Sequence, residues 1–337
     1  MTLTVNLLTG FLGSGKTSLL RRLLHAPELA DTAVLINELG EVGLDHLLVE
    51  AVDEEVVLLA SGCICCTIRG ELKDALLRLI DRARAGLIPP FSRVVVETTG
   101  LADPAPVVAT FAADPMLRHQ VRVGNIVTVV DAVNGWSNLD RFTEAAHQVA
   151  VADRLVISKT DLAPPAEVQR LRARLAGLNP TAAITLSGET DPAPVSLLLA
   201  DVHDTRTKTA EVRRWFTAVP AHDHAASHRP EVQAHRLAAD RPLDWAAFGL
   251  WLTLLLHRHG QRILRVKGLL DVAGVRQPVV IQGVQHLIHP PLHLRAWPKG
   301  EHGTRLVVIA QGLDRALLER SFKSFQALAT EPQASLT

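Results

Sequence analysis

The sequence predicts a doubly wound α/β domain followed by a smaller α+β domain. The chain has 337 residues, which at roughly 150 residues per domain corresponds to about two domains. Before residue 209, short β-branched runs alternate with segments of helical period, and between residues 209 and 230 this alternation gives way to a polar, proline-bounded stretch. We therefore assign residues 1–212 to the α/β domain, 213–230 to a linker with a short histidine segment, and 231–337 to the second domain.

The first domain is predicted from continuous apolar runs, which are typical of strands buried on both faces of a mostly parallel sheet. The predicted strands are Leu3–Leu8, Ala33–Ile36, Val56–Leu59, Arg93–Val96, Asn125–Val130 and Leu155–Ile157. The predicted helices are Lys16–His25, Arg69–Ala85, Val107–Ala112, Asp140–Val149 and Pro165–Ala176.

The second domain mixes extended runs with two amphipathic helices. The predicted helices are Pro242–His259, which ends before Gly260, and Asp314–Leu328. The predicted extended segments are Val232–Leu237, Ile263–Val272, Val279–Ile288, His293–Trp297 and Leu306–Gln311.

Composition excludes several classes of partner. Lys plus Arg and Asp plus Glu each number 35, so the formal net charge is zero and gives no overall electrostatic reason to bind nucleic acid. The longest apolar stretch, Ala246–Leu256, is much shorter than the roughly 20 residues that span a bilayer. The crowded cysteines at positions 63, 65 and 66 cannot form a disulfide framework and are expected to be reduced thiols of a cytoplasmic protein.

A phosphate-binding loop is predicted where the first strand meets the first helix. Residues 10–17 read Gly-Phe-Leu-Gly-Ser-Gly-Lys-Thr, a pattern whose backbone N–H groups surround phosphate oxygens at a helix N-terminus. Lys16 would neutralise the β and γ phosphates, and the Thr17 hydroxyl would ligate Mg²⁺. The predicted nucleotide-binding residues of this loop are Gly10, Gly13, Ser14, Gly15, Lys16, Thr17 and Ser18.

Two further motifs follow apolar strands, at the sheet edge where nucleotides bind. Glu97, at the end of one strand, is suited to holding the metal's water shell, and Gly100 to contacting the γ-phosphate; Lys16, Thr17 and Glu97 are the predicted catalytic residues. Residues 158–161, Ser-Lys-Thr-Asp, are similar to the guanine-recognition motif Asn-Lys-x-Asp. We expect Ser158, Lys159 and Asp161 to contact the base, with one hydrogen bond weakened because serine replaces asparagine.

A thiol cluster is the predicted site for a second kind of metal. In an extended segment Cys63 and Cys65 point to the same side, while Cys66 faces away unless the backbone turns. Thiolates select Zn²⁺, Cu(I) or Co²⁺ over Mg²⁺, and a tetrahedral ion here would need further ligands. Glu38 and Glu41, in a segment that also contains Asp45 and His46, could supply one, and so could a client protein. The alternative is that this segment is an ordinary solvated acidic loop.

Histidines of the linker form an auxiliary candidate for metal binding. His222, His224 and His228 lie close together in the sequence. The alternative is a solvated linker with no ligand role.

Taken in order, these motifs resemble the CobW-type P-loop GTPases, metallochaperone-like proteins tied to zinc or cobalt handling. The segments that carry the resemblance in the first domain are Gly-Phe-Leu-Gly-Ser-Gly-Lys-Thr, Asn-Glu-Leu-Gly-Glu-Val-Gly-Leu-Asp, Gly-Cys-Ile-Cys-Cys-Thr-Ile-Arg-Gly-Glu-Leu and Glu-Thr-Thr-Gly-Leu-Ala-Asp-Pro. In the second domain they are Leu-Arg-Val-Lys-Gly-Leu-Leu, Ile-Gln-Gly-Val-Gln-His and Arg-Leu-Val-Val-Ile-Ala-Gln-Gly-Leu-Asp, which are similar to the CobW C-terminal domain. The resemblance implies GTP and Mg²⁺ at the loop ending in Thr17, a transition metal on the three cysteines, and a metal affinity that depends on the bound nucleotide.

The sequence thus predicts a slow GTPase that binds a transition metal, Zn²⁺ or Co²⁺, and delivers it to a client metalloprotein. It leaves open whether the ion bridges two protomers of a homodimer. The alternative is a GTP-regulated metal-buffering or sensing module without productive hydrolysis. A third hypothesis is an ATP-using kinase. Asp161 argues against it, because this carboxylate would accept a hydrogen bond from the C2 amine of guanine, which adenine lacks.

Overall fold

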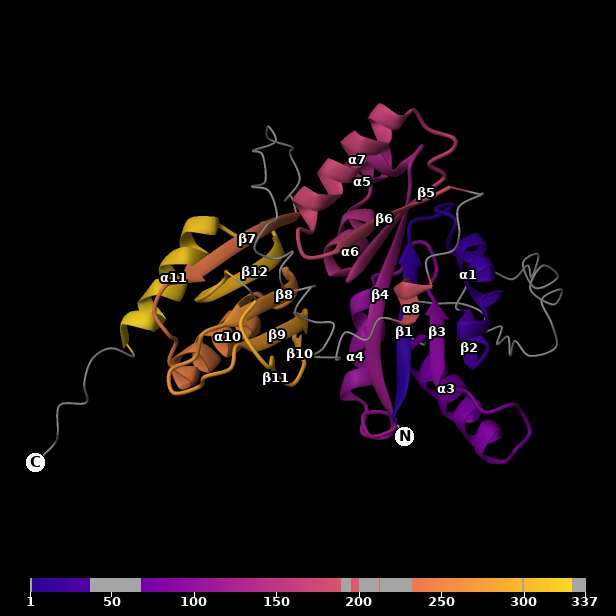
Figure 1. Cartoon of the computed structure of the whole chain (residues 1–337), viewed down its shortest axis with the longest axis horizontal. Coiled ribbons are helices and arrows are strands. Elements are labelled where there is room, and N and C mark those ends of the chain that lie inside the picture. The colour runs from indigo at the N-terminus through magenta and orange to yellow at the C-terminus, as the bar shows by residue number, and fades with distance from the viewer. Residues whose placement is uncertain are drawn as a thin grey trace, which may run out of the picture. The chain divides into compact units, whose positions relative to one another are not determined.

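The computed structural model describes residues 2–36, 68–188, 195–199, 212, 232–298 and 300–328 (Figure 1). The chain divides into two compact units. The N-terminal unit comprises Met1–Ala173 and Ala182–Val202, and the C-terminal unit comprises Arg174–Thr181 and His203–Thr337.

The N-terminal unit is built on a six-stranded parallel sheet with the strand order β2-β3-β1-β4-β5-β6. The strands are β1 (Leu3–Gly10), β2 (Thr32–Ile36), β3 (Arg93–Glu97), β4 (Val121–Asp131), β5 (Arg154–Ser158) and β6 (Ala183–Ser187). The helical segments are α1 (Lys16–Leu24), η1 (Pro27–Leu29), α3 (Ile68–Arg84), α4 (Pro104–Ala113), α5 (Gly135–Arg141), α6 (Thr143–Val151), α7 (Pro165–Leu178), whose last residues fall in the C-terminal unit, and α8 (Ser196–Leu199).

Helices cover both faces of this sheet. Val127 and Val129 of β4 lie in one core cluster with leucines of α1 and α8. Thr128, between them, points to the opposite face, where its hydroxyl donates a hydrogen bond of 2.7 Å to the Gln148 carbonyl of α6. Successive side chains of a strand alternate between faces, so α1 and α6 lie on opposite sides, and the predicted doubly wound architecture is confirmed.

One local prediction for this unit was wrong, and one strand was missed. The predicted helix Asp140–Val149 is divided between α5 and α6, because Phe142 is extended (φ −126°, ψ 119°) and its ring packs on Phe11 with centroids 4.6 Å apart. Strand β6 was not predicted; four of its five residues are not fully buried, so it lacks the apolar run that revealed the other strands. The predicted strand Val56–Leu59 lies outside the described residues.

The C-terminal unit has an antiparallel sheet in the order β10-β9-β8-β12-β7, with β11 also pairing with β9. The strands are β7 (Val232–Ala239), β8 (Ile263–Leu270), β9 (Val279–Val284), β10 (Leu287–Ile288), β11 (Leu292–His293) and β12 (Thr304–Gln311). Helices α10 (Trp245–His259) and α11 (Arg315–Leu328) cover one face of it through a shared core centred on Trp251, Phe322 and Val308.

Side-chain caps set the beginnings of these two helices. Asp244 accepts from the Ala247 N–H at 2.8 Å, so α10 begins three residues after the predicted Pro242. Asp314 caps α11 in the same way. The predicted strand Val279–Ile288 is a hairpin, β9 and β10, with Gln285 in the left-handed region (φ 49°) at its turn. Within the part of the chain that the structure describes, no helix has the length and apolar character needed to cross a membrane.

Candidate functional site

The predicted phosphate loop connects β1 to α1 and has the backbone that its glycines allow. Gly13 and Gly15 adopt positive φ angles of 69° and 87°, which glycine tolerates and other residues disfavour. At Gly10 (φ 143°) an added Cβ would lie 2.2 Å from the Val129 carbonyl oxygen, so only glycine lets the loop start this close to β4. Ser18 is exposed in the first turn of α1.

Lysine and threonine at the end of the loop make the polar contacts of the site. The Lys16 Nζ donates to the Gly10 carbonyl at 3.0 Å and lies 3.5 Å from that of Phe11. The Thr17 hydroxyl donates to Glu97 Oε1 at 2.7 Å, across 80 residues of sequence. Because Glu97 is only 1% exposed and ends β3, next to β1 in the sheet, the fold brings together all three predicted catalytic residues. A hydroxyl and a carboxylate are hard oxygen ligands of the kind that Mg²⁺ prefers, so this corner fits the expected ion.

The loop after β3 touches the phosphate loop directly. A Cβ on Gly100 would lie 2.7 Å from the backbone nitrogen of Leu12. On its other side this loop is held by Gln148 of α6, whose Nε2 donates to the carbonyls of Gly100 and Ala102, each at 3.0 Å. The sequence analysis missed Gln148, because nothing in its local pattern distinguishes it from other polar residues of an amphipathic helix.

The serine and lysine of the predicted base motif hold the phosphate loop from a third side. The Ser158 hydroxyl, 6% exposed, donates to the Ser14 carbonyl at 2.6 Å. The Lys159 Nζ donates to the Gly13 carbonyl at 2.8 Å and to Asp131 Oδ2 at 2.7 Å, and Lys159 itself has a left-handed backbone (φ 55°). The hydroxyl that replaces the motif's asparagine is therefore engaged with the loop.

Asp131 is a second residue that the sequence analysis missed. It ends β4 after a long apolar run, the same signal that revealed Glu97, so that signal was available. Burial alone would raise the pKa of Asp131, but hydrogen bonds from Lys159, the Val133 N–H and Asn134 hold it below its ordinary value. The predicted base-reading carboxylate, Asp161, is exposed just beyond β5.

The predicted transition-metal ligands lie outside the described residues. These are Cys63, Cys65, Cys66, Glu38, Glu41, His222, His224 and His228. Within the described ranges, no group of three or more His, Cys, Asp or Glu side chains is arranged to hold a metal ion.

Sequence comparison agrees with this geometry. Residues 4–186 match the family model described as "CobW/HypB/UreG, nucleotide-binding domain", and residues 232–326 match "Cobalamin synthesis protein cobW C-terminal domain". The chain belongs to the CobW family of P-loop GTPases. The predicted resemblance is thereby confirmed over both domains.

Individual CobW-family relatives extend over most of the chain. It is 34% identical to "Zinc chaperone YjiA" of Escherichia coli over 85% of this chain and 87% of that protein. It is 31% identical to "Zinc chaperone CobW" of Pseudomonas aeruginosa over 96% and 91%. Among solved structures, Zn(II)-bound YjiA GTPase from E. coli aligns with a TM-score of 0.71 and 27% identity, covering 96% of this chain and 99% of that one.

Proposed function

We propose that this CobW-family chain is a GTP-hydrolysing metallochaperone that binds Zn²⁺ at Cys63, Cys65 and Cys66 and delivers it to a client metalloprotein. The hydrogen bond between Thr17 and Glu97 carries the GTPase part, because it joins the phosphate loop to the acid of β3 in the arrangement that a nucleotide with Mg²⁺ requires. The cysteine cluster and the relatives named as zinc chaperones support the metal. Co²⁺ suits the same thiolates and is the second candidate.

The hydrolytic mechanism uses few side chains. The backbone N–H groups of residues 13–17 would surround the phosphates, and the Lys16 Nζ would exchange its loop carbonyls for β- and γ-phosphate oxygens. Mg²⁺, bound through Thr17 and through water held by Glu97, would neutralise charge on the phosphates. Water then attacks the γ-phosphorus in line, forming inorganic phosphate and GDP. Because no motif of the sequence indicates an arginine finger or an activating glutamine, we expect slow intrinsic turnover that a client protein accelerates.

Nucleotide control of metal binding is supported by strand register. Ile36, the last residue of β2, pairs with Glu97 of β3. Ile36, which directly precedes the segment with Glu38, Glu41 and the cysteines in the sequence, therefore lies beside the acid of the nucleotide site. A change at Glu97 on hydrolysis can reach that segment through its attachment point.

The remaining features follow from composition and chemistry. Reduced thiols as ligands favour the cytoplasm. Three thiolates with one or two carboxylates can complete an ion within one chain or across two protomers, so a homodimer is an outcome to be measured. His222, His224 and His228 are a secondary candidate for metal binding, with a solvated linker as the alternative.

A competition titration tests the proposal. The reduced protein is titrated with Zn²⁺ and Co²⁺ against a chromogenic chelator, with GDP or a non-hydrolysable GTP analogue present. We expect Cys63→Ala/Cys65→Ala to abolish tight binding and the matched variant His222→Ala/His224→Ala to retain it. Wild-type affinity should differ between the two nucleotides.

Kinetics separates the proposal from the alternative of a metal buffer. Client-stimulated GTP turnover accompanied by metal transfer supports the chaperone. Metal binding with equal affinity in both nucleotide states, and without stimulated turnover, would reject nucleotide-controlled delivery in favour of the buffer.

A further inference from the structure

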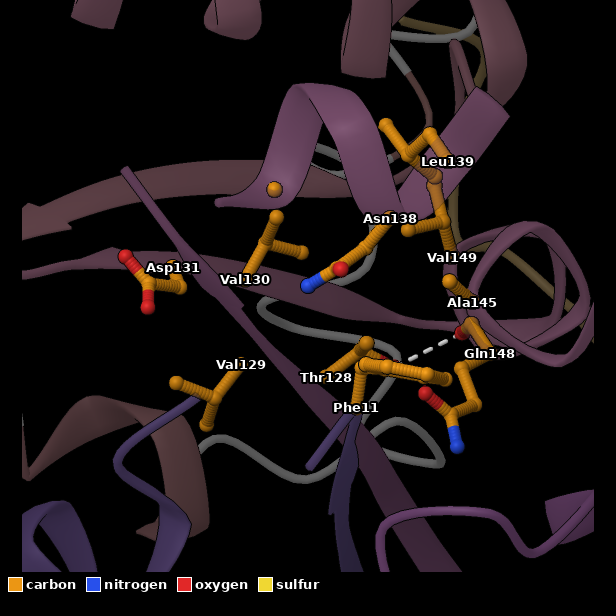
Figure 2. Close-up of a pocket in the computed structure, with 11 residues that line it drawn as sticks. Phe11, Thr128, Val129, Val130, Asp131, Asn138, Leu139, Ala145, Gln148 and Val149 are labelled. Carbon is orange, nitrogen blue, oxygen red and sulfur yellow. Dashed lines mark hydrogen bonds between the residues drawn. The ribbon is translucent and has the colours of Figure 1, made fainter. Parts of the chain in front are cut away.

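The buried amide of Gln148 fastens α6 to the loop that follows β3. The side chain is 1% exposed, and its Nε2 donates to the carbonyls of Gly100 and Ala102, each at 3.0 Å. The backbone carbonyl of Gln148 accepts from the Thr128 hydroxyl of β4 at 2.7 Å, as the dashed line in Figure 2 shows, which holds this part of α6 against the sheet. A primary amide has two hydrogens on nitrogen, so the two carbonyls can each receive one.

The loop held by Gln148 also borders the phosphate loop. It begins after Glu97, which accepts the hydrogen bond from Thr17, and its middle residue Gly100 lies in contact with the Leu12 backbone. These two contacts fix the loop on the side of the phosphate loop. Gln148 fixes its far side, so the position of residues 100–102 depends on this amide.

Gln148 also lines a small cavity, which makes conservative variants practical. Phe11, Asn138 and Gln148 are among the residues around it (Figure 2), and its volume is about 10 Å³, close to the space of one water molecule. Methionine and glutamate have nearly the length and volume of glutamine. Either residue can occupy position 148 without overpacking the core.

We propose that Gln148 is a positioning residue that keeps residues 100–102 against the phosphate loop, so that the site distinguishes a nucleoside triphosphate from a diphosphate. The loop follows the metal-side acid at the carboxyl end of β3, where a third phosphate extends beyond the two cradled by the phosphate loop. The loop of residues 100–102 therefore contributes to the binding of a triphosphate and not to that of a diphosphate. Gln148 touches neither nucleotide nor metal in this assignment, and the inference rests on the proposed GTPase function.

Two variants and one matched control test this assignment. Gln148→Met removes both donors at constant shape, and Gln148→Glu replaces them with a carboxylate facing two carbonyls. The control is Gln120→Met, because the half-buried Gln120, remote from the phosphate loop in the sequence, likewise donates its Nε2 to a backbone carbonyl, that of Met116 at 3.0 Å. Dissociation constants are measured by titration for GDP and for a non-hydrolysable GTP analogue, and hydrolysis by single turnover.

We expect Gln148→Met to weaken the affinity for the GTP analogue about tenfold and that for GDP less than twofold, a difference of about 1.0–1.4 kcal/mol. Single-turnover hydrolysis should slow by a similar factor, and Gln120→Met should match wild type. For Gln148→Glu we expect the same loss at pH 8 and partial recovery near pH 5.5, because a buried carboxyl protonates readily and can then donate one hydrogen bond. A purely structural role would give GDP and the analogue the same dependence on pH, whereas the positioning role confines the recovery to the analogue.

Several outcomes would overturn the assignment. Equal losses for GDP and the analogue would show a structural role, and wild-type behaviour of Gln148→Met would show no role. If Gln148→Met fails to fold, Gln148→Glu decides through the recovery of triphosphate affinity at low pH. Failure of the wild-type protein to bind GTP would reject the proposed function itself, which is a separate result.

Discussion

The contact between Gly100 and the phosphate loop permits a sharp prediction for Gly100→Ala. The added Cβ would lie 2.7 Å from the nitrogen and 2.8 Å from the Cα of Leu12, where ordinary contact begins near 3.4 Å. The two loops must therefore separate by about 0.7 Å, and backbone atoms cannot rotate away as a flexible side chain could. Overpacking of this kind costs about 1–3 kcal/mol, and about 1.4 kcal/mol is tenfold in affinity, so we expect a loss of roughly 10- to 100-fold in affinity for the GTP analogue. Overpacking should also lower the free energy of unfolding by about 1–3 kcal/mol.

Calorimetric titration of GDP and the analogue, with thermal unfolding of the same samples, measures both effects. The matched control is Gly177→Ala in α7, where an added Cβ meets nothing within 4 Å. This variant should bind normally and gain about 0.5–1 kcal/mol, since alanine is favoured over glycine inside a helix. If Gly100→Ala binds the analogue within twofold of wild type, the two loops are not as rigidly apposed as the structure indicates.

Three further predictions concern stability. Hydrogen bonds, chiefly from Lys159, lower the pKa of Asp131, so its charge stabilises the fold fully above the ordinary carboxyl pKa of 3.8 and progressively less as the pH falls through the pKa of the folded state. Asp131→Asn should lower the free energy of unfolding by about 1–2 kcal/mol at pH 7, measured by urea denaturation. The same loss at pH 3 would contradict this argument. Arg22→Ala should lower the free energy of unfolding by about 1–2 kcal/mol, because its guanidinium donates at 2.6 Å and 3.0 Å to groups at and just after the end of β6; an unchanged thermal midpoint would count against it. Trp251→Ala should destabilise the C-terminal unit by about 3–5 kcal/mol, whereas Trp245→Ala, at a side chain 46% exposed, should change it by less than about 1 kcal/mol; similar losses for the two would refute the burial argument.

The parts of the site that the sequence predicted are those encoded by local motifs. Lys16 and Thr17 come from one short pattern, and Glu97 from the rule that functional acids follow apolar strands at the carboxyl edge of a parallel sheet. Their contact across 80 residues follows once β1 and β3 are neighbours. The apolar runs alone do not reveal which strands are neighbours. The expectation that Thr17 and Glu97 share one nucleotide site implied that β1 and β3 lie close together.

Gln148 could not be predicted in the same way. Its partners, Gly100 and Ala102, are backbone carbonyls 48 and 46 residues away, and a carbonyl carries no residue identity that a sequence pattern could reveal. The break between α5 and α6 at Phe142 is similar, because the ring contact with Phe11 overrides a helical period that continues through both segments.

Two side chains at and just after the end of β5 hold the backbone of the phosphate loop in place. Ser158 holds the Ser14 carbonyl and Lys159 the Gly13 carbonyl, so replacing the motif's asparagine by serine does not release the loop. Dipoles that are already oriented stabilise charge without a cost of reorganisation. Lys16 is different, because its Nζ bonds the Gly10 carbonyl and must exchange that partner for phosphate oxygen. The Lys16 ammonium therefore has hydrogen-bond acceptors in both arrangements, the Gly10 carbonyl in one and phosphate oxygens in the other.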